Sequence, residues 1–391
     1  MTEPLTPAEG PLLEEALGLA SGTVSLQSQE PLGDGSVVGF DVPDGADGLL
    51  YYVDTSRLRV PAETGMLLGT PEDPQTRIWL HPADPHLPAL APVAFGGALA
   101  GLLQRLGITA MGAADFIIYR AGRRAVLRVP VEHGQVWVKI VRPSRVERTV
   151  QAHTAFAEAG VATPAVLGWS SEGLIVLADA EGTPVADVIW DPESLLDQID
   201  ELRGQIERTN LSIPARGVAG RLDWYAARVR GLPQADQLVQ QIRDGQHTLA
   251  GAEDVVVHGD LHFGQLFLDA DGAISSVIDV DTAGRGPAAE DPAAFISHAA
   301  TSALLAQGST AERVWELADA AWRRWGSEIG VAQLCAIQLL GQAVSASDAG
   351  EQARAATLLR IGQAVLAGSA PSVGAGESKP KDALMDSFER S

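Results

Sequence analysis

The segment from Val255 to Asp281, VVVHGDLHFGQLFLDADGAISSVIDVD, constrains the fold more than any other part of this 391-residue chain. Its three short apolar runs predict three β-strands, and the Asp-Gly pair between the second and third runs predicts a tight hairpin. That hairpin accounts for the turn residues. It does not account for Asp260, Gln265 and Asp279, because polar groups beside buried strands are costly unless they are paired or bind a metal.

The predicted hairpin folds Asp279 back to the start of its first strand, close to the loop that carries Asp260 and Gln265. Two carboxylates and one amide then converge, and hard oxygen ligands of this kind suit Mg²⁺ shared with phosphate oxygens. Phosphoryl transfer requires little more of a protein than a metal clamp, a lysine on the phosphates and a carboxylate that orients the attacking hydroxyl. The segment therefore predicts a metal and phosphate site.

Composition excludes some classes of partner. The chain has 50 acidic and 28 basic residues and a formal net charge of −22, which argues against binding to nucleic acid. The same charge would favour a cationic substrate or only aid solubility. We find no run of about 18 apolar residues and no signal peptide, so we expect no membrane partner and a cytoplasmic location. The single cysteine, Cys335, lies in an apolar helical pattern and is expected to be a buried thiol.

The motif HGDLH, followed by Gln265 and then by IDVD, resembles the catalytic segment of the aminoglycoside phosphotransferase-like kinases, a branch of the protein-kinase-like fold. The strand VWVKIV resembles the family's lysine-bearing strand, and LIVLADAEGTPV resembles its interlobe hinge. The similar segments run from about residue 112 to residue 300, roughly half of the chain.

The resemblance implies a role for each matching residue. Asp260 would be the catalytic carboxylate, and Gln265 and Asp279 would be the metal ligands. Lys139 would contact the phosphates of ATP. Asp291 matches a downstream aspartate that caps a helix and is mainly structural. The implied cofactors are ATP and Mg²⁺, and the implied partner is a small molecule that offers a hydroxyl group.

The hinge and two further positions complete the candidate site. The backbone at Leu177, Ala178 and Asp179 would meet adenine. Asp281, just after the second metal ligand, is either a substrate contact or a surface turn residue. Trp322 lies on a late helix, where a core role is the default and stacking on a sugar is the alternative.

The resemblance and the patterns together predict an α+β, bilobed, protein-kinase-like fold. We expect an N-terminal α+β cap domain at 1–95 and a strand-rich lobe with the nucleotide-binding sheet and helix at 96–180. A mainly helical lobe with the catalytic loop follows at 181–367. Residues 368–391 are small and polar, which predicts a disordered tail.

The position of Lys139 and two departures from the family pattern carry further information. Lys139 alternates with Val138 and Ile140, which places it on the opposite face of its strand, although a solvated lysine on an edge strand is the simpler alternative. The glutamate expected to pair with it is replaced by Thr149. The amide ligand is Gln265 rather than asparagine, and Gly264 is expected to make room for it through unusual dihedral angles.

The Gly-Gln form resembles bacterial sugar kinases of the maltokinase and glucosamine-kinase type, which also carry an N-terminal cap domain. We therefore predict a kinase that phosphorylates a sugar or aminosugar, with a role in carbohydrate metabolism. The first alternative is a kinase for an aminoglycoside-type antibiotic. The second is a kinase-like protein that binds nucleotide without turnover, which the absent glutamate favours and the retained Asp260, Gln265 and Asp279 oppose.

Overall fold

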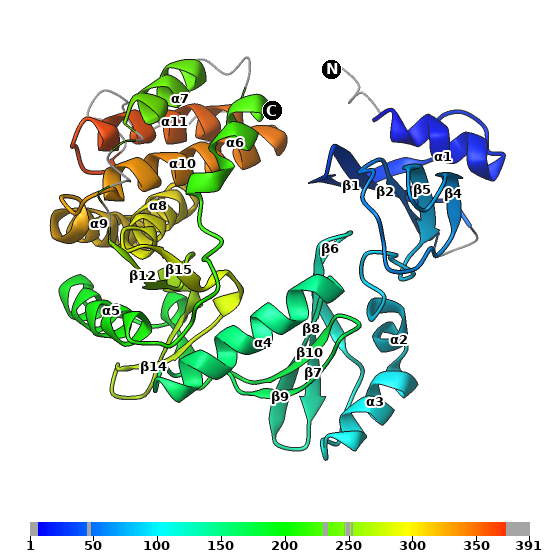
Figure 1. Cartoon of the computed structure of the whole chain (residues 1–391), viewed down its shortest axis with the longest axis horizontal. Coiled ribbons are helices and arrows are strands. Elements are labelled where there is room, and N and C mark those ends of the chain that lie inside the picture. Colours follow the sequence, from blue (N-terminus) through cyan, green and yellow to red (C-terminus); the bar gives the residue numbers. More distant parts are fainter. Residues whose placement is uncertain are drawn as a thin grey trace, which may run out of the picture. The chain divides into compact units, whose positions relative to one another are not determined.

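The computed structural model describes residues 7–44, 48–229, 234–245, 247, 251 and 253–372. Contacts divide the chain into two compact units, one containing Met1–Thr154 and Pro164–Ala180, the other containing Ala155–Thr163 and Glu181–Ser391. The predicted fold class is confirmed, because strands dominate the first unit and helices the second (Figure 1). The four predicted domain boundaries stay a prediction, and residues 373–391 of the predicted tail lie outside the described residues.

The first unit begins with helix α1 and a five-stranded antiparallel sheet in the order β1-β2-β3-β5-β4. These elements are α1 (Glu9–Leu17), β1 (Ser25–Leu32), β2 (Gly35–Val42), β3 (Leu49–Asp54), β4 (Met66–Gly69) and β5 (Pro74–Leu80). Alternation along β2 decides the packing: Val38 and Phe40 join Leu13 of α1 in one core, whereas Val37 belongs to a second core on the other face, with Trp79.

A second five-stranded sheet follows in the order β6-β7-β8-β10-β9. Its elements and covering helices are α2 (Leu90–Ala94), α3 (Gly96–Arg105), β6 (Asp115–Arg120), β7 (Arg124–Val131), β8 (Gly134–Val141), α4 (Pro143–Glu158), β9 (Val166–Ser170) and β10 (Leu174–Ala178). Val136, Val138 and Ile140 pack in one core with residues of α2 and α3. Trp137 and Val141 of β8 pack instead in the core with Val146 of α4, so the predicted two-faced alternation of β8 is confirmed.

A buried carboxylate ties the turn between β6 and β7 to the preceding segment. Asp84 is 1% exposed, and it accepts hydrogen bonds from the backbone N–H of Gly122 at 2.7 Å and from the hydroxyl of Tyr119 at 3.0 Å. Burial raises the pKa of Asp84, and the bond from Gly122 opposes that rise. The N–H of Gly122 is therefore engaged inside the protein.

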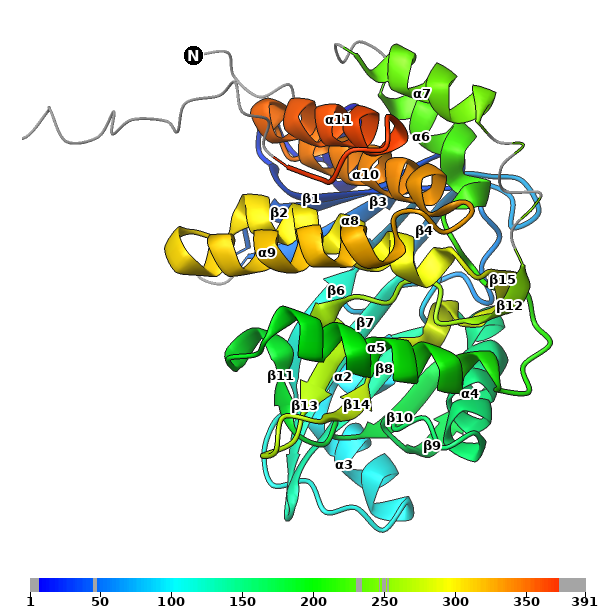
Figure 2. The same cartoon turned by 90° about the vertical axis from the view of Figure 1, so that its left-hand side faces the viewer.

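The second unit is built around α10, with α8 and α11 packed beside it and α9 packed against α8 (Figure 2). Its helices are α5 (Pro192–Glu207), α6 (Leu222–Arg228), α7 (Ala235–Asp244), α8 (Glu290–Leu305), α9 (Gly308–Trp325), α10 (Val331–Asp348) and α11 (Gln352–Leu366). Asp191 caps α5 by accepting a hydrogen bond from the N–H of Ser194 at 2.9 Å. Cys335 of α10 is fully buried, which confirms the prediction for this thiol.

Two small sheets lie in the second unit, with strand orders β11-β13-β14 and β12-β15. The strands are β11 (Thr183–Pro184), β12 (Asp254–Val257), β13 (Leu266–Leu268), β14 (Ile274–Val277) and β15 (Gly284–Pro287). Among the described helices, none has the length and apolarity needed to cross a lipid bilayer.

Candidate functional site

The predicted hairpin is present and brings its two ends together. Strands β13 and β14 pair antiparallel, with Leu266 opposite Val277. The N–H of Ile278 then donates to the backbone oxygen of Gln265 at 3.0 Å. Because this bond closes the base of the hairpin, Asp279 follows directly beside Gln265, as the sequence predicts.

The loop before the hairpin is held by a buried carboxylate. Asp291, 3% exposed in the first turn of α8, accepts hydrogen bonds from the N–H groups of His258 at 2.9 Å and Gly259 at 2.7 Å. The expectation that Asp291 caps its own helix is wrong, since the N-cap of α8 is Ala289 and has no side-chain hydrogen bond. Gly259 adopts a left-handed φ of 82°, which turns two successive amides towards one carboxylate.

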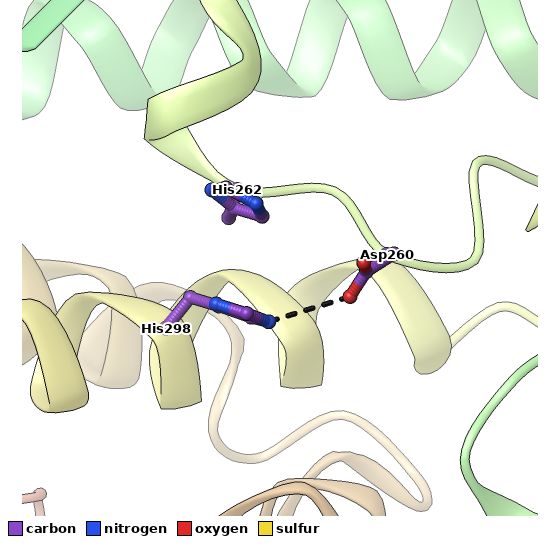
Figure 3. A group of neighbouring side chains, drawn as sticks. All are labelled: Asp260, His262 and His298. Carbon is purple, nitrogen blue, oxygen red and sulfur yellow. Dashed lines mark ion pairs between the residues drawn. The ribbon is translucent and has the colours of Figure 1, made fainter. Parts of the chain in front are cut away.

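Asp260 follows these amides, and one of its oxygens contacts two helices. Its Oδ1 lies 3.3 Å from Nε2 of His298 on α8 and 3.4 Å from Nε2 of Gln338 on α10 (Figure 3). Burial alone would raise the pKa of Asp260, but the hydrogen bond and charge of His298 outweigh it and hold the pKa below the ordinary value. Asp260 is therefore a carboxylate at neutral pH, able to accept a hydrogen bond from a hydroxyl group.

Sequence reasoning missed His298 and Gln338. Each is a polar residue with mostly apolar neighbours in a long helix, a pattern that usually marks nothing more than a satisfied core residue. The helical period places both on inward-facing positions, but only the packing of α8 and α10 against the loop brings them to Asp260.

The side chain of Gln265 fits a cation ligand. It is 4% exposed, and its Oε1 is buried with no hydrogen-bond partner among the described residues. A buried acceptor without a partner is costly, and a hard metal ion would satisfy it. Asp279 has a left-handed φ of 63°, a conformation that non-glycine residues adopt rarely and often at functional sites.

Gly264 serves a different purpose from the one predicted. Its φ is not among the positive values of this chain, so the expectation of unusual dihedral angles is wrong. A Cβ at this position would lie 3.1 Å from both Nδ1 and Cε1 of His262. The missing side chain therefore leaves space for the His262 ring.

Lys139 and the predicted hinge lie in the first unit, whereas Asp260, Gln265 and Asp279 lie in the second. Strand β8 lies between β7 and β10, and Lys139 is 6% exposed, so the alternative of a solvated lysine on an edge strand is wrong. On α4, Thr149 is buried, at 2% exposure.

The hinge residues end strand β10. Leu177 packs in the core beside α4, and the N–H of Ala178 donates to the oxygen of Ala165 at 2.9 Å. The carboxylate of Asp179 accepts a hydrogen bond from Nε1 of Trp137 at 2.7 Å. The contacts of these side chains stabilise the end of the strand, and a nucleotide-binding role rests on their backbone and stays a prediction.

The two candidate substrate residues have different surroundings. Asp281 is half-buried near Arg216. Burial and the charge of Arg221 lower the pKa of Arg216, and the negative charge of Asp281 only partly opposes this decrease. The indole of Trp322 packs over Gly326, where a Cβ would approach it to 2.7 Å. Among the described residues no hydrogen bond, ion pair or ring contact joins Trp322 to Asp260, so its substrate role stays a prediction.

Glu290, beside Asp291, provides a stability test. It is 3% exposed, and burial is the main reason why its pKa rises to about 7. In the unfolded chain this carboxyl has its ordinary pKa of 4.5, so between pH 4.5 and 7 the folded state binds more protons and its stability falls as pH rises. We expect Glu290→Gln to remove this loss and to stabilise the protein at pH 8 by about 3 kcal/mol relative to the wild type, with little difference at pH 4.

Urea unfolding of both proteins from pH 4 to pH 8 measures this difference. Glu201→Gln makes the same charge change at an exposed position and is the control, so it should leave the pH dependence unaltered. Equal slopes of stability against pH for wild type and Glu290→Gln would contradict the assignment.

Residues 118–327 match the model of the phosphotransferase enzyme family. No curated protein matches the chain. Among solved structures, amicoumacin kinase hAmiN in complex with AMP-PNP, Ca²⁺ and Ami is 12% identical with a TM-score of 0.52, over 72% of this chain and 96% of that one. A thermostable mutant of aminoglycoside phosphotransferase APH(4)-Ia, in ternary complex with ADP and hygromycin B, is 16% identical with a TM-score of 0.50, over 71% and 98%. Macrolide 2′-phosphotransferase type I is 18% identical with a TM-score of 0.45, over 68% and 95%.

The likeness to the first two structures shows a shared fold, and the family match spans more than half of the 391 residues. The matched region contains β7, β8 and the whole β12–β15 segment. The predicted enzyme class, a kinase that phosphorylates a hydroxyl group of a small molecule, is confirmed at this level. The predicted use of ATP with a divalent cation agrees with the nucleotides and Ca²⁺ of these complexes. The chain belongs to the phosphotransferase enzyme family.

Proposed function

We propose that this enzyme transfers the γ-phosphoryl group of ATP to a hydroxyl of a sugar or aminosugar, with Asp260 as the residue that orients the acceptor. The observation that carries the proposal is the ionisation of Asp260 and the different hydrogen bonding of its two carboxylate oxygens. Its carboxylate is ionised, Oδ1 is held by His298 and Gln338, and Oδ2 makes no hydrogen bond to the described residues. An ionised carboxylate with one open oxygen is suited to accept a hydrogen bond from a hydroxyl.

Gln265 and Asp279 would hold Mg²⁺. The support is the unpartnered buried Oε1 of Gln265 and the hydrogen bond from Ile278 that keeps the two residues adjacent. When bound, Mg²⁺ supplies charge neutralisation on the β- and γ-phosphates. The strained backbone of Asp279 fits a residue whose side chain must be aimed at one point.

Lys139 would neutralise the α- and β-phosphates, and the backbone at Leu177, Ala178 and Asp179 would meet adenine. The place of Lys139 on the central strand β8 supports this role, because pairing with strands on both sides fixes the position of its backbone. With the N–H of Gly122 engaged by Asp84, Lys139 would carry a larger share of phosphate binding than in a kinase with an open glycine-rich loop.

A sugar acceptor is favoured by the side chains that surround Asp260. His298 and Gln338 offer an imidazole and an amide, which are hydrogen-bonding groups suited to hydroxyls. The resemblance of the Gly264-Gln265 pair to sugar kinases points the same way. The second candidate, an aminoglycoside-type acceptor, is supported by the net charge of −22 and by the fold shared with a hygromycin B complex.

An acceptor panel tests the proposal. ATP consumption would be measured with glucose, glucosamine, maltose, kanamycin, hygromycin B and erythromycin, with Asp260→Asn as the control. We expect Asp260-dependent turnover on at least one sugar, and the glucose and glucosamine pair shows whether an ammonium group is recognised. Turnover on the antibiotics alone would favour the second candidate. No Asp260-dependent turnover on any acceptor would contradict the catalytic proposal.

A further inference from the structure

His298 is the closest basic side chain to the carboxylate of Asp260 among the ion pairs of the described residues. The Nε2–Oδ1 distance is 3.3 Å, and the side chains are 27% and 36% exposed (Figure 3). Gln338 approaches the same oxygen, with its Nε2 3.4 Å from Oδ1 and 3.1 Å from Nε2 of His298. Two donors from two helices therefore converge on one oxygen of the catalytic carboxylate.

The carboxylate settles which groups carry protons. An ionised carboxylate can only accept, so both neighbours satisfy it when His298 carries a proton on Nε2 and Gln338 points its amide nitrogen at Oδ1. The alternative tautomer would aim a lone pair of His298 at a negative oxygen at 3.3 Å. The arrangement thus makes His298 a donor to Oδ1.

The His298 ring is held in place from one side by His262. The two rings are stacked, with centroids 4.3 Å apart and an interplanar angle of 16°. Gly264 leaves the space that His262 needs for this position. Burial, followed by the charge of His298, lowers the pKa of His262 to about 4, so His262 is neutral near pH 7 and does not repel a proton on His298.

The cluster suits hydrogen bonding better than metal binding. Asp260, His262 and His298 are residue types that bind transition metals, and their ligand atoms lie within 4.8 Å of one another. Chelation requires lone pairs that meet at one point, whereas the nitrogen lone pairs of two stacked rings lie in two nearly parallel planes.

The side chain of Gln338 is a polar group in an apolar part of α10, next to Asp260. It is 9% exposed within α10, where the surrounding positions are buried and apolar. A buried amide without partners is costly, and with the proton of His298 on Nε2, the acceptor for the Gln338 nitrogen in the described part of the chain is Oδ1 of Asp260. The core of α10 therefore carries a polar group whose contacts serve the carboxylate.

We propose that His298 is a positioning residue for phosphoryl transfer: together with Gln338 it fixes Oδ1 of Asp260 and turns Oδ2 towards the acceptor hydroxyl. This inference rests on the proposed function. In the step itself, the acceptor oxygen forms a bond to the γ-phosphorus while the bond from phosphorus to the β–γ bridging oxygen of ATP breaks. The electron pair leaves with ADP, and the hydroxyl proton passes to Oδ2 of Asp260.

Two substitutions of His298 distinguish the effect of its N–H donor from the effect of its aromatic ring. His298→Phe keeps an aromatic ring that can stack on His262 but has no donor, whereas His298→Gln keeps an N–H donor near the position of Nε2. We expect His298→Phe to lower kcat by about 10²-fold, since a misplaced catalytic group costs about that much, with KM for ATP unchanged. His298→Gln should restore most of kcat. Thr301→Val, which removes a hydrogen bond between α8 and α10 one turn further along, is the control and should leave kcat unchanged.

The double variant tests whether His298 acts through Asp260. If it does, adding His298→Phe to Asp260→Asn should cost no further activity, because the two residues work as a unit. Equal kcat for His298→Phe and wild type would overturn the proposal, as would a His298→Gln variant that is as weak as His298→Phe. If wild type and Asp260→Asn turned over the acceptor at the same rate, the proposed function itself would be overturned.

A second measurement needs no acceptor. Long-range ¹H–¹⁵N NMR spectra of the histidine rings report which nitrogen of His298 is protonated. We expect a proton on Nε2, and a change of the His298 ¹⁵N shifts in Asp260→Asn. A neutral ring protonated on Nδ1 alone would contradict the donor role of His298. So would His298 ¹⁵N chemical shifts that are the same in wild type and Asp260→Asn.

Discussion

Asp260→Asn is expected to lower kcat by about 10²- to 10⁴-fold, the range for loss of a group that accepts a proton in the reaction. The asparagine side chain has the same shape and can still accept a hydrogen bond from His298 or Gln338 through its Oδ1. What it loses is the negative charge that orients and finally takes the acceptor proton. Because the role proposed for Asp260 is to orient the acceptor and not to hold the nucleotide, Mg²⁺-dependent ATP binding should remain within about threefold of the wild type.

The measurement is kcat on the best acceptor of the panel, together with calorimetric binding of ATP and Mg²⁺. Asp254→Asn provides the matched control, because Asp254 is an exposed aspartate four residues before the loop at the start of β12. It should retain wild-type turnover. An Asp260→Asn enzyme with kcat within tenfold of the wild type would exclude Asp260 as the residue that takes the acceptor proton.

Asp279→Asn is expected to weaken Mg²⁺-dependent ATP binding by about 10²-fold or more. Loss of an outer partner of a metal site already costs 10- to 100-fold in affinity, and removal of a charged ligand should cost at least as much. Asparagine tolerates the left-handed conformation that Asp279 adopts, so the backbone at the base of the hairpin should be preserved. The variant therefore tests the charge without breaking the fold.

Calorimetric titration of ATP with and without Mg²⁺ measures this effect. Asp281→Asn makes the same change two residues further along, and we expect it to leave ATP binding unaltered. If Asp279→Asn and wild type bound ATP with the same Mg²⁺ dependence, Asp279 would not be a metal ligand.

Much of the fold followed from local patterns. The Asp-Gly turn and the flanking apolar runs predicted the β13–β14 hairpin, and hence the approach of Asp279 to Gln265, because strand pairing fixes which residues meet. Alternation in β8 predicted the face on which Lys139 lies. One alternative stayed open and one expectation was wrong for the same reason: the position of β8 inside its sheet and the bonds of Asp291 to the loop depend on segments distant in sequence.

The sequence by itself determined the chemistry of the site: an HGD loop, a Gly-Gln pair and a second aspartate at hairpin spacing, which are enough to predict the family. Only the tertiary structure decided how Asp260 is held. His298 and Gln338 reach one carboxylate oxygen from α8 and α10, and Gln338 is 78 residues away along the chain. Period and spacing report which residues share a face within one element. They carry no information about which helices pack against a loop, since that choice depends on burial of apolar surface over the whole unit.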